Sequence, residues 1–475
     1  MSDFARPSPR DPPDQQVADP SAGTAAVGAT EKSDPAWVSA LPLRLREGLS
    51  GRHGLHAILA NSGWLMLDRM LRLLLALIVG AWVARHLGPA RYGQLAYVVA
   101  LLAFFNAFAN LGLDGIVVRD LAQDGRAAPS ILGTTLYLRL VAGLGCWAFA
   151  VGLTTILRRG DTEALTMIGI LGAGMVLQSS DVVDLWFQSQ TRSRLTVLCR
   201  AVAYCSASLV KVGLILADAP LWMFALALLG DTLLASVALI YAYRKSSAAD
   251  RWQWNSVLAR QLLLEGWPFM LAGLSVVIYM RIDQLLLLEL SDEHQLGLYS
   301  AILPFSQVWH MIPMTVCSSV FPRLSTLRRD DPVQYTRRLQ QLFTAMAWSG
   351  LIVSMVTGLF APWLVGTLLG PGFAEAAGVL RWHAFTNIFA FLGVAQSVTI
   401  INDRKSHISL VKTLSGAATS VAMNYFLVPH WGAIGSAWAA VGSYFVAAII
   451  TNIFVAPVAF SMQLTAIWPF HVRRA

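Results

Sequence analysis

The sequence predicts an all-α polytopic membrane protein with about twelve transmembrane helices in two parallel-repeat, six-helix lobes around a central cavity. Three observations predict this fold. First, 56% of the 475 residues are hydrophobic and only 13% are charged, whereas soluble domains carry about 25% charged residues. Second, apolar segments long enough to cross a hydrocarbon core of about 30 Å recur along the chain. Third, the two halves of the chain resemble each other, which indicates an internal duplication.

The first residues of the chain differ from the rest. Residues 1–35 are rich in Pro, Asp, Ala, Ser and Gly, a composition that buries too little apolar surface to fold, and no apolar signal-peptide core follows the start. Apolar residues at helical spacing up to Leu49 then predict a short amphipathic helix on the membrane surface. We therefore expect the following domains: a disordered tail over 1–50 that ends in this helix, lobes over 51–245 and 262–460, a linker over 246–261 and a second tail over 461–475.

Twelve apolar segments of helical length come after the first tail. Several contain Gly or Pro, which membrane helices tolerate where a neighbouring helix or a cavity satisfies the freed backbone groups. The segments are 62–86, 92–117, 131–157, 164–189, 195–217, 221–243, 262–289, 296–321, 341–367, 374–401, 407–429 and 433–458.

Basic residues predict how this bundle is oriented, because short cytoplasmic loops are rich in Lys and Arg. Every loop after an even-numbered segment contains Lys or Arg, whereas those after the fifth and later odd-numbered segments contain none. We therefore expect both termini to be cytoplasmic. The net charge of +8 is assigned to these loops, and no nucleic-acid partner is expected.

An internal repeat relates the two halves. Because six spans separate the copies, both have the same orientation in the membrane, as in transporters whose site lies between two lobes. The matching pairs are Arg192 and Arg404, Arg200 and Lys412, Ala225 and Ala437, and Gly230 and Gly442 at an offset of 212, and Gly93 and Gly297 at an offset of 204.

Charged residues inside the predicted spans are functional candidates, because a charge in hydrocarbon needs a partner, water or a substrate. Arg281 and Asp231 lie near the predicted midplane, too deep to reach either interface. Two interpretations remain open: an ion pair that holds the bundle together, or charges that line a central cavity. Asp283 lies two positions from Arg281 and points elsewhere on the helix.

The first span also carries charge. Arg69 and Arg72 share one helix face, and Asp68 lies one turn from Arg72. Arg69 is near enough to the inner headgroups to extend its charged end to them, which leaves Arg72 as the better cavity candidate. Lys211 and Arg381 lie in the outer third of their helices, and both roles stay open for them.

Three other charges lie near the inner ends of their spans. We expect Arg139 to extend to the headgroups, and an interfacial role is one of several open to Asp181 and Asp184. The candidate cavity residues are therefore Arg72, Arg281, Asp231, Asp283, Asp68, Arg69, Lys211 and Arg381.

Patterns typical of enzymes are missing from the sequence. There is no Gly-Lys dipeptide and hence no phosphate-binding P-loop, and there is no HExxH zinc motif. The four cysteines lack the spacing of metal ligands. We expect a transporter with no catalytic residues, no metal site and no cofactor.

Four stretches of the chain match a known pattern. They are ARHLGPARYG (84–93), LGLDGIVVRDL (111–121), DLWFQSQTRSR (184–194) and RIDQLLL (281–287). These stretches resemble the Wzx-type oligosaccharide flippases, the polysaccharide-export family of the multidrug/oligosaccharidyl-lipid/polysaccharide (MOP) exporter superfamily. The resemblance covers most of residues 60–460 and is most specific at the first two spans.

This resemblance implies a protein that flips a lipid-linked oligosaccharide, carried on undecaprenyl pyrophosphate, across a bacterial inner membrane for O-antigen, capsule or exopolysaccharide biosynthesis. It also implies a polysaccharide polymerase and other biosynthesis proteins as further partners. Arg72 and Arg281 lie on equivalent helices of the two lobes. They would hold the phosphates through charge-assisted hydrogen bonds while the lobes rock around the cavity.

Two other functions stay open. A multidrug or metabolite exporter of the related efflux family would be coupled to an H⁺ or Na⁺ gradient through an intramembrane carboxylate, either Asp231 or Asp283. An integral-membrane polymerase or ligase would carry a large outward loop with catalytic Arg or His, whereas every predicted outward loop is short.

Overall fold

The computed structural model describes residues 53–158, 160–190, 193–246, 251–403 and 405–467. The chain divides into two compact units, Met1–Leu59 and Ala60–Ala475, and the second unit contains the membrane-spanning helices. The predicted tail and its amphipathic helix over 1–50 lie outside the described residues. So do Arg192 and Arg404, one of the pairs in the predicted repeat.

The described residues form helices joined by short turns. The first half of the chain forms α3 (His53–Ala109), α4 (Asp114–Gln123), η1 (Gly125–Ala127), α5 (Ala128–Leu157), α6 (Thr162–Leu177), η2 (Gln178–Asp181), α7 (Val182–Ser189), α8 (Ser193–Leu216) and α9 (Leu221–Arg244). The second half forms α10 (Ser256–Leu290), α11 (Glu293–Gln307), η3 (Val308–His310), α12 (Met311–Asp330), α13 (Pro332–Leu364), η4 (Val365–Leu369), η5 (Pro371–Phe373), α14 (Ala376–His383), α15 (Thr386–Asn402), α16 (Ser406–Phe445), η6 (Val446–Ile450), α17 (Thr451–Val455) and α18 (Pro457–Ile467).

These helices provide the twelve predicted spans. Nine helical stretches among the described residues are long and apolar enough to cross a membrane. Two of them, α3 and α16, are each divided into two spans by a non-helical glycine, Gly88 and Gly432. Together, α11, η3 and α12 form the remaining span. The prediction of an all-α, multi-spanning protein is therefore confirmed.

Polar side chains at helix N-termini explain why the turns between spans can be so short. Asp161, Asp292 and Asp331 accept hydrogen bonds from backbone N–H groups in the first turns of α6, α11 and α13. Asn255 does the same at α10, where it accepts from two N–H groups. Such caps satisfy donors that have no partner within the helix, so α6, α11 and α13 begin a few residues after the preceding helix ends.

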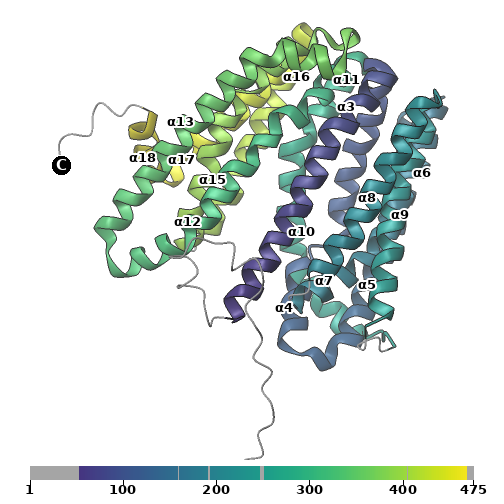
Figure 1. Ribbon diagram of the computed structural model, residues 1–475, viewed down its shortest axis with the longest axis horizontal. Coiled ribbons are helices and arrows are strands. Elements are labelled where there is room, and N and C mark those ends of the chain that lie inside the picture. Colours follow the sequence, from purple (N-terminus) through teal and green to yellow (C-terminus); the bar gives the residue numbers. More distant parts are fainter. Residues whose placement is uncertain (1–52, 159, 191–192, 247–250, 404, 468–475) are drawn as a thin grey trace, which may run out of the picture. The chain divides into compact units, whose positions relative to one another are not determined.

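Two groups of helices make up the unit Ala60–Ala475. In Figure 1, α3 and α10 run between α4–α9 on one side and α12, α13, α15, α17 and α18 on the other. We call α3–α9 the N-lobe and α10–α18 the C-lobe. The turns at Gly88, Ser291, Gly370 and Gly432 lie at one end of the bundle, the Gly88 end, and those at Asp124, Asp331 and Asp403 lie at the opposite Asp124 end.

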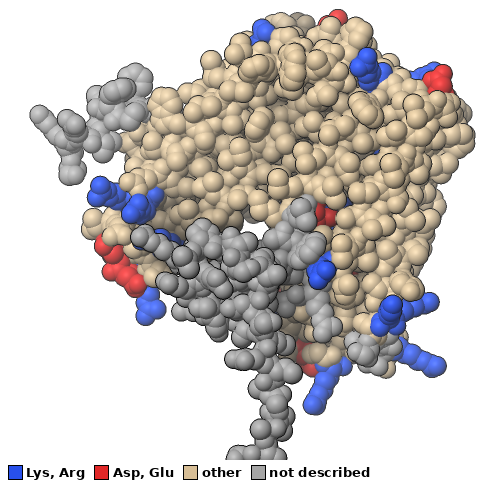
Figure 2. Space-filling view, viewed as in Figure 1, with Lys and Arg blue, Asp and Glu red and all other residues tan. Residues whose placement is uncertain are grey.

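The charged surface is concentrated at these ends. Figure 2 shows most of the visible Lys and Arg side chains near the upper, left and lower edges of one face, with few of them in the area between. The band between the edges is largely uncharged, as expected of a surface that faces lipid.

The core that joins the two lobes most extensively lies at the Gly88 end. One cluster of buried residues there combines Val98 and Phe224 of the N-lobe with Tyr299 and Phe373 of the C-lobe. Towards the Asp124 end the core separates into two clusters. One surrounds Phe187 and consists of N-lobe residues together with Leu262 from the start of α10, and the other consists of C-lobe residues.

At the Gly88 end the two lobes meet in close backbone contacts at Gly93 and Gly297, which we call the glycine crossing. A methyl group on Gly93 would overlap the backbone of Glu293, and one on Gly297 would overlap the backbone of Pro89. The same offset of 204 that relates Gly93 to Gly297 also relates Pro89 to Glu293. The predicted repeat therefore maps each of these two contacts onto the other, as a two-fold axis does in an interface between identical subunits. The internal duplication is visible in the geometry.

The start of α10 contacts the N-lobe. Arg119 forms a two-bond ion pair with Glu265, at 2.5 and 3.0 Å. At the adjacent turn, a side chain on Gly112 or on Gly266 would overlap the backbone of the other segment. The first turns of α10 therefore pack on the N-lobe, while the rest of this helix packs along α16 in the C-lobe.

Candidate functional site

A central cavity of about 470 Å³ lies between the lobes. Its walls come from both spans of α3, from α8 and α9, and from α10 and α11. Two cations line it, Lys211 from the N-lobe and Arg281 from the C-lobe. Several of its lining residues, among them Val79, Leu95 and Phe224, belong to the core that joins the lobes at the Gly88 end.

Arg281 is the cation whose position fits its predicted role best. Its guanidinium donates a hydrogen bond of 3.3 Å to Gln284, which also lines the cavity. Among the described residues no carboxylate forms an ion pair with it. Ser300 lines the same cavity, and its buried hydroxyl has no hydrogen-bond partner among the described residues. Buried polar groups without partners are costly, which is typical of a site that awaits a ligand.

Lys211 and Arg72 share an aromatic ring. The Nζ atom of Lys211 lies 5.7 Å from the ring centre of Tyr204, and the guanidinium carbon of Arg72 lies 5.6 Å from it. Tyr204 and Lys211 line the central cavity, but Arg72 does not. Instead Arg72 is paired with Asp68 at 3.1 Å. The N-lobe cation that faces Arg281 across the cavity is therefore Lys211.

The two candidate coupling carboxylates lie outside the cavity wall. Asp231 is half-buried, and it interacts electrostatically with Lys211 and Arg72 without forming an ion pair among the described residues. Asp283 is buried, accepts a hydrogen bond from the Tyr299 hydroxyl, and accepts a second of 2.8 Å from the backbone N–H of Gln284. Its side chain thus points into the C-lobe and away from Arg281, as the helical spacing predicted.

Of the remaining candidates, Arg69 lines a second cavity, and Arg381 lines neither this cavity nor the central one. A C-lobe cavity of about 750 Å³ is lined by Arg69 from α3 together with Tyr279, His310 and Lys412 from the C-lobe. Arg381 lies on an exposed face of α14. It packs beside Gly358 of α13.

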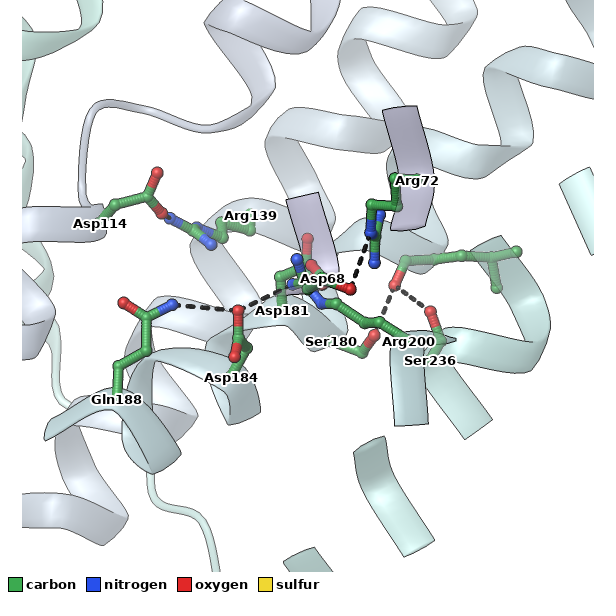
Figure 3. A network of polar contacts seen from close by, with 11 residues as sticks. Asp68, Arg72, Asp114, Arg139, Ser180, Asp181, Asp184, Gln188, Arg200 and Ser236 are labelled. Carbon is green, nitrogen blue, oxygen red and sulfur yellow. Dashed lines mark hydrogen bonds and ion pairs between the residues drawn. The ribbon is translucent and has the colours of Figure 1, made fainter. Parts of the chain in front are cut away.

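The charges near the Asp124 end of the N-lobe are paired with one another (Figure 3). Arg200 contacts Asp181 at 3.0 Å and Asp184 at 2.8 Å. Arg139 pairs with Asp114, and its side chain is only 3% exposed. Our expectation that Arg139 extends to the headgroups is therefore wrong, because its side chain is buried and pairs with a carboxylate on the neighbouring helix α4.

Lys412 is a buried cation that sequence reasoning missed. Its side chain is 9% exposed, and its ammonium donates to the side-chain oxygen of Gln396. The signal that could have found it was the repeat, since Arg200 and Lys412 are equivalent at the offset of 212. A comparison of the ion-pair partners of these two equivalent cations would have shown that Lys412 lacks a carboxylate partner among the described residues.

The central cavity can bind an anion. Two cations from different lobes face it, and a free hydroxyl lies beside them. Arg and Lys bind phosphate and carboxylate oxygens through charge-assisted hydrogen bonds, about twice as strong as neutral ones. Twelve spans in two repeat-related lobes with such a cavity between them form an architecture that is found in membrane transporters.

Solved structures of transporters share this fold. A multidrug resistance MATE family transporter of the MOP superfamily, in an inward-facing conformation, matches with a TM-score of 0.70 and 16% identity over 83% of this chain and 96% of that one. The lipid II flippase MurJ, in an inward closed conformation, matches with a TM-score of 0.66 and 11% identity over 88% of this chain and 94% of that one.

Sequence comparison places the chain in a family. Residues 58–328, more than half of the chain, match the family Polysaccharide biosynthesis protein. The chain belongs to this family, and it has the fold of these MOP-superfamily transporters, as its resemblance to the flippases indicated.

Two relatives are named as transport proteins. The succinoglycan biosynthesis transport protein ExoT of Rhizobium meliloti (strain 1021) is 24% identical over 309 residues, which are 63% of this chain and 60% of that protein. This chain thus aligns with less than two thirds of that relative's length. The probable flippase AglR of Haloferax volcanii is 21% identical over 386 residues, 76% of this chain and 75% of that protein.

Proposed function

We propose that this protein flips a lipid-linked oligosaccharide, carried on undecaprenyl pyrophosphate, from the cytoplasmic to the outer leaflet of a bacterial inner membrane. The observation that carries the proposal is the pair of cations, Lys211 and Arg281, that line one cavity from opposite lobes without ion-pairing carboxylates among the described residues. A pyrophosphate carries the opposite charge. Its polyprenyl tail can stay in lipid while the polar head crosses inside the protein.

The distribution of charge supports the direction. Loops at the Asp124 end are rich in Lys and Arg, which favours a cytoplasmic location for that end and for both termini. We expect the cavity to open on the same side, because the extensive core between the lobes lies at the Gly88 end and, among the described buried residues, only Leu262, from the start of α10, joins the N-lobe cluster at the other end. The head group would therefore enter from the cytoplasm.

Rocking of the lobes would release the head group on the other side. The glycine crossing at Gly93 and Gly297 brings two backbones into contact with no side chain between them. Such a contact can separate without breaking a buried ion pair. In the released state the lobes would close at the Asp124 end instead.

The ion-coupled exporter is the rival that a test must separate from the flippase. A cationic cavity repels cationic drugs, which argues for an anionic substrate. Coupling to H⁺ or Na⁺, and docking of a polysaccharide polymerase and other biosynthesis proteins, are further predictions of the flippase proposal. The cavity and its charges support transport rather than enzyme catalysis.

Deletion of the gene in its host tests the proposal. We expect lipid-linked oligosaccharide to accumulate on the cytoplasmic leaflet and surface glycan to disappear, and the full-length chain to restore both. Unchanged surface glycan, together with a lost efflux of a soluble cationic dye, would establish the exporter instead. Carrying out both measurements in one strain separates the two functions.

A further inference from the structure

The C-lobe cavity contains a cation that the proposed transport route through the central cavity does not use. Lys412 lies on α16, six positions after Ser406, or about 9 Å along the helix from the Asp124 end. Its side chain is 9% exposed and lines the C-lobe cavity. No acidic side chain among the described residues pairs with it.

The only described hydrogen-bond acceptor of Lys412 is an amide that is already engaged. Gln396 donates a hydrogen bond of 2.7 Å to Asn452, and its oxygen accepts one of 3.0 Å from the same residue. Asn452 also donates to Gln463 at 3.0 Å. This amide chain is fully buried and carries no charge, so it does not neutralise the ammonium. Lys has three donors, and the contact with Gln396 uses one.

The N-lobe shows how the same position is neutralised. Arg200, the repeat equivalent of Lys412, contacts Asp184 at 2.8 Å. The offset of 212 that relates these cations also relates Asp184 to Gln396. The pairing geometry is thus duplicated in both lobes, whereas the carboxylate is present only in the N-lobe. A buried cation without a counter-charge is destabilising, and a bound anion would remove that cost.

Further groups turn the C-lobe cavity into a site. Arg69 reaches it from the N-lobe and has no ion pair among the described residues. His310 lines it with a buried ring nitrogen, Nε2, that has no hydrogen-bond partner among the described residues. Thr413 adds a hydroxyl beside Lys412. The volume of about 750 Å³ accommodates a phosphate group with part of a chain attached.

We propose that Lys412 and Arg69 form a second anion site, which receives the phosphate groups of the lipid-borne substrate on their way to the central cavity. The assignment to the substrate rests on the proposed function. The site lies nearer the Asp124 end than Arg281 does, so a head group entering from that side meets it first. Transfer to Lys211 and Arg281 then moves the phosphates from one pair of cations to the next.

The test uses the full-length protein in nanodiscs of zwitterionic lipid, with undecaprenyl pyrophosphate as the probe and undecaprenol, which lacks the phosphates, as the reference. Binding is measured in a background in which Lys211→Gln and Arg281→Gln remove the cations of the central cavity. Into this background we introduce Gln396→Glu, which gives the C-lobe the carboxylate that the N-lobe already has. Lys412→Gln is the second variant, and Arg200→Lys, which keeps its ion pairs, is the matched control.

We expect Gln396→Glu and Lys412→Gln each to weaken binding of undecaprenyl pyrophosphate by about 10-fold to 100-fold, the loss of one charge-assisted interaction. Arg200→Lys should leave it within about twofold, and undecaprenol should bind all of them alike. Equal affinity in the background and in the Gln396→Glu variant would overturn the proposal. Since this variant retains Lys412, a folding defect of Lys412→Gln does not affect the conclusion.

Vesicles that contain phosphatidylglycerol distinguish the source of the phosphate. The proposal requires undecaprenyl pyrophosphate to bind in its presence, and equal competition by phosphatidylglycerol would show a site for bilayer lipids and overturn it. The outcome is separable from that of the gene deletion. Binding that depends on Lys412 in a protein whose deletion leaves surface glycan intact would refute the flippase function and leave the anion site standing.

Discussion

Two regions of the protein bury charge in opposite ways. At the Asp124 end of the N-lobe, Arg200 has two carboxylate partners and Arg139 has one (Figure 3). In the central cavity, Lys211 and Arg281 have no ion-pair partner among the described residues. A charge that serves structure is satisfied where it lies, whereas a charge that binds a ligand is left unsatisfied until the ligand arrives. The difference separates two roles that look alike in the sequence.

The largest expected effect comes from the contact that brings both cations to one cavity. Gly297→Val would place a branched side chain against the backbone of Pro89, so the lobes could not meet at the Gly88 end. We expect flipping of a fluorescent lipid-linked oligosaccharide in proteoliposomes to be abolished. Gly273→Ala is the matched control, because a methyl group there meets no atom within 4 Å. Normal flipping by Gly297→Val would show that this crossing does not shape the cavity.

Removal of the C-lobe cation should have the next largest effect. We expect Arg281→Ala to lower the export of surface glycan by about 10-fold or more, the loss of a charge-assisted interaction with phosphate, while its membrane level stays normal. Arg281→Lys should keep partial activity if charge alone matters, and should fail if two parallel hydrogen bonds to phosphate are needed. Normal glycan in the Arg281→Ala strain would remove this residue from the site.

A change in the paired region should act on stability instead. Asp184→Asn leaves Arg200 with Asp181 as its remaining carboxylate partner. We expect this variant to lose about 1–3 kcal/mol of stability, the usual cost of a poorly satisfied buried group, measured as a lower melting temperature of the purified protein. An unchanged melting temperature would contradict the structural role.

The smallest effect is expected where a pair is exposed. The side chains of Arg119 and Glu265 are 47% and 43% exposed, and water competes for such ion pairs. Arg119→Ala should therefore leave the melting temperature unchanged within error. A drop as large as that of Asp184→Asn would mean that burial does not decide which pairs stabilise this fold.

Much of the architecture could be predicted from the sequence, because hydropathy and loop charge act locally along the chain. The spans could be derived from them, and the duplication from residues that match at a fixed offset, such as Gly93 and Gly297. The rotation of each helix could not, because it depends on packing against neighbours that the sequence does not name. For this reason Arg72 seemed the better cavity residue, whereas the structure turns it towards Asp68 and places Lys211 in the wall.

The position of a charged residue along its span also failed to predict its ion-pair partner. Arg139 was expected at the headgroups because it lies near the end of its span, yet a carboxylate on α4, more than twenty residues away in the chain, pairs with it. Lys412 was matched to Arg200 in the repeat but was not named as a site candidate, because a single Lys in an apolar segment carries no pattern. It became informative only beside Arg200, its equivalent in the other lobe. Comparison of the two repeats would have been the better guide.

One charge from each region can be compared in a single assay. The rate at which a fluorescent lipid-linked oligosaccharide crosses the bilayer of proteoliposomes, per folded molecule, is measured for Arg281→Gln and for Asp184→Asn. We predict a loss of about 10-fold or more for the first variant and, for the second, a rate equal to that of the unmodified protein. Equal rates for the two variants, or a loss confined to Asp184→Asn, would contradict the claim that the unpaired cations carry the substrate.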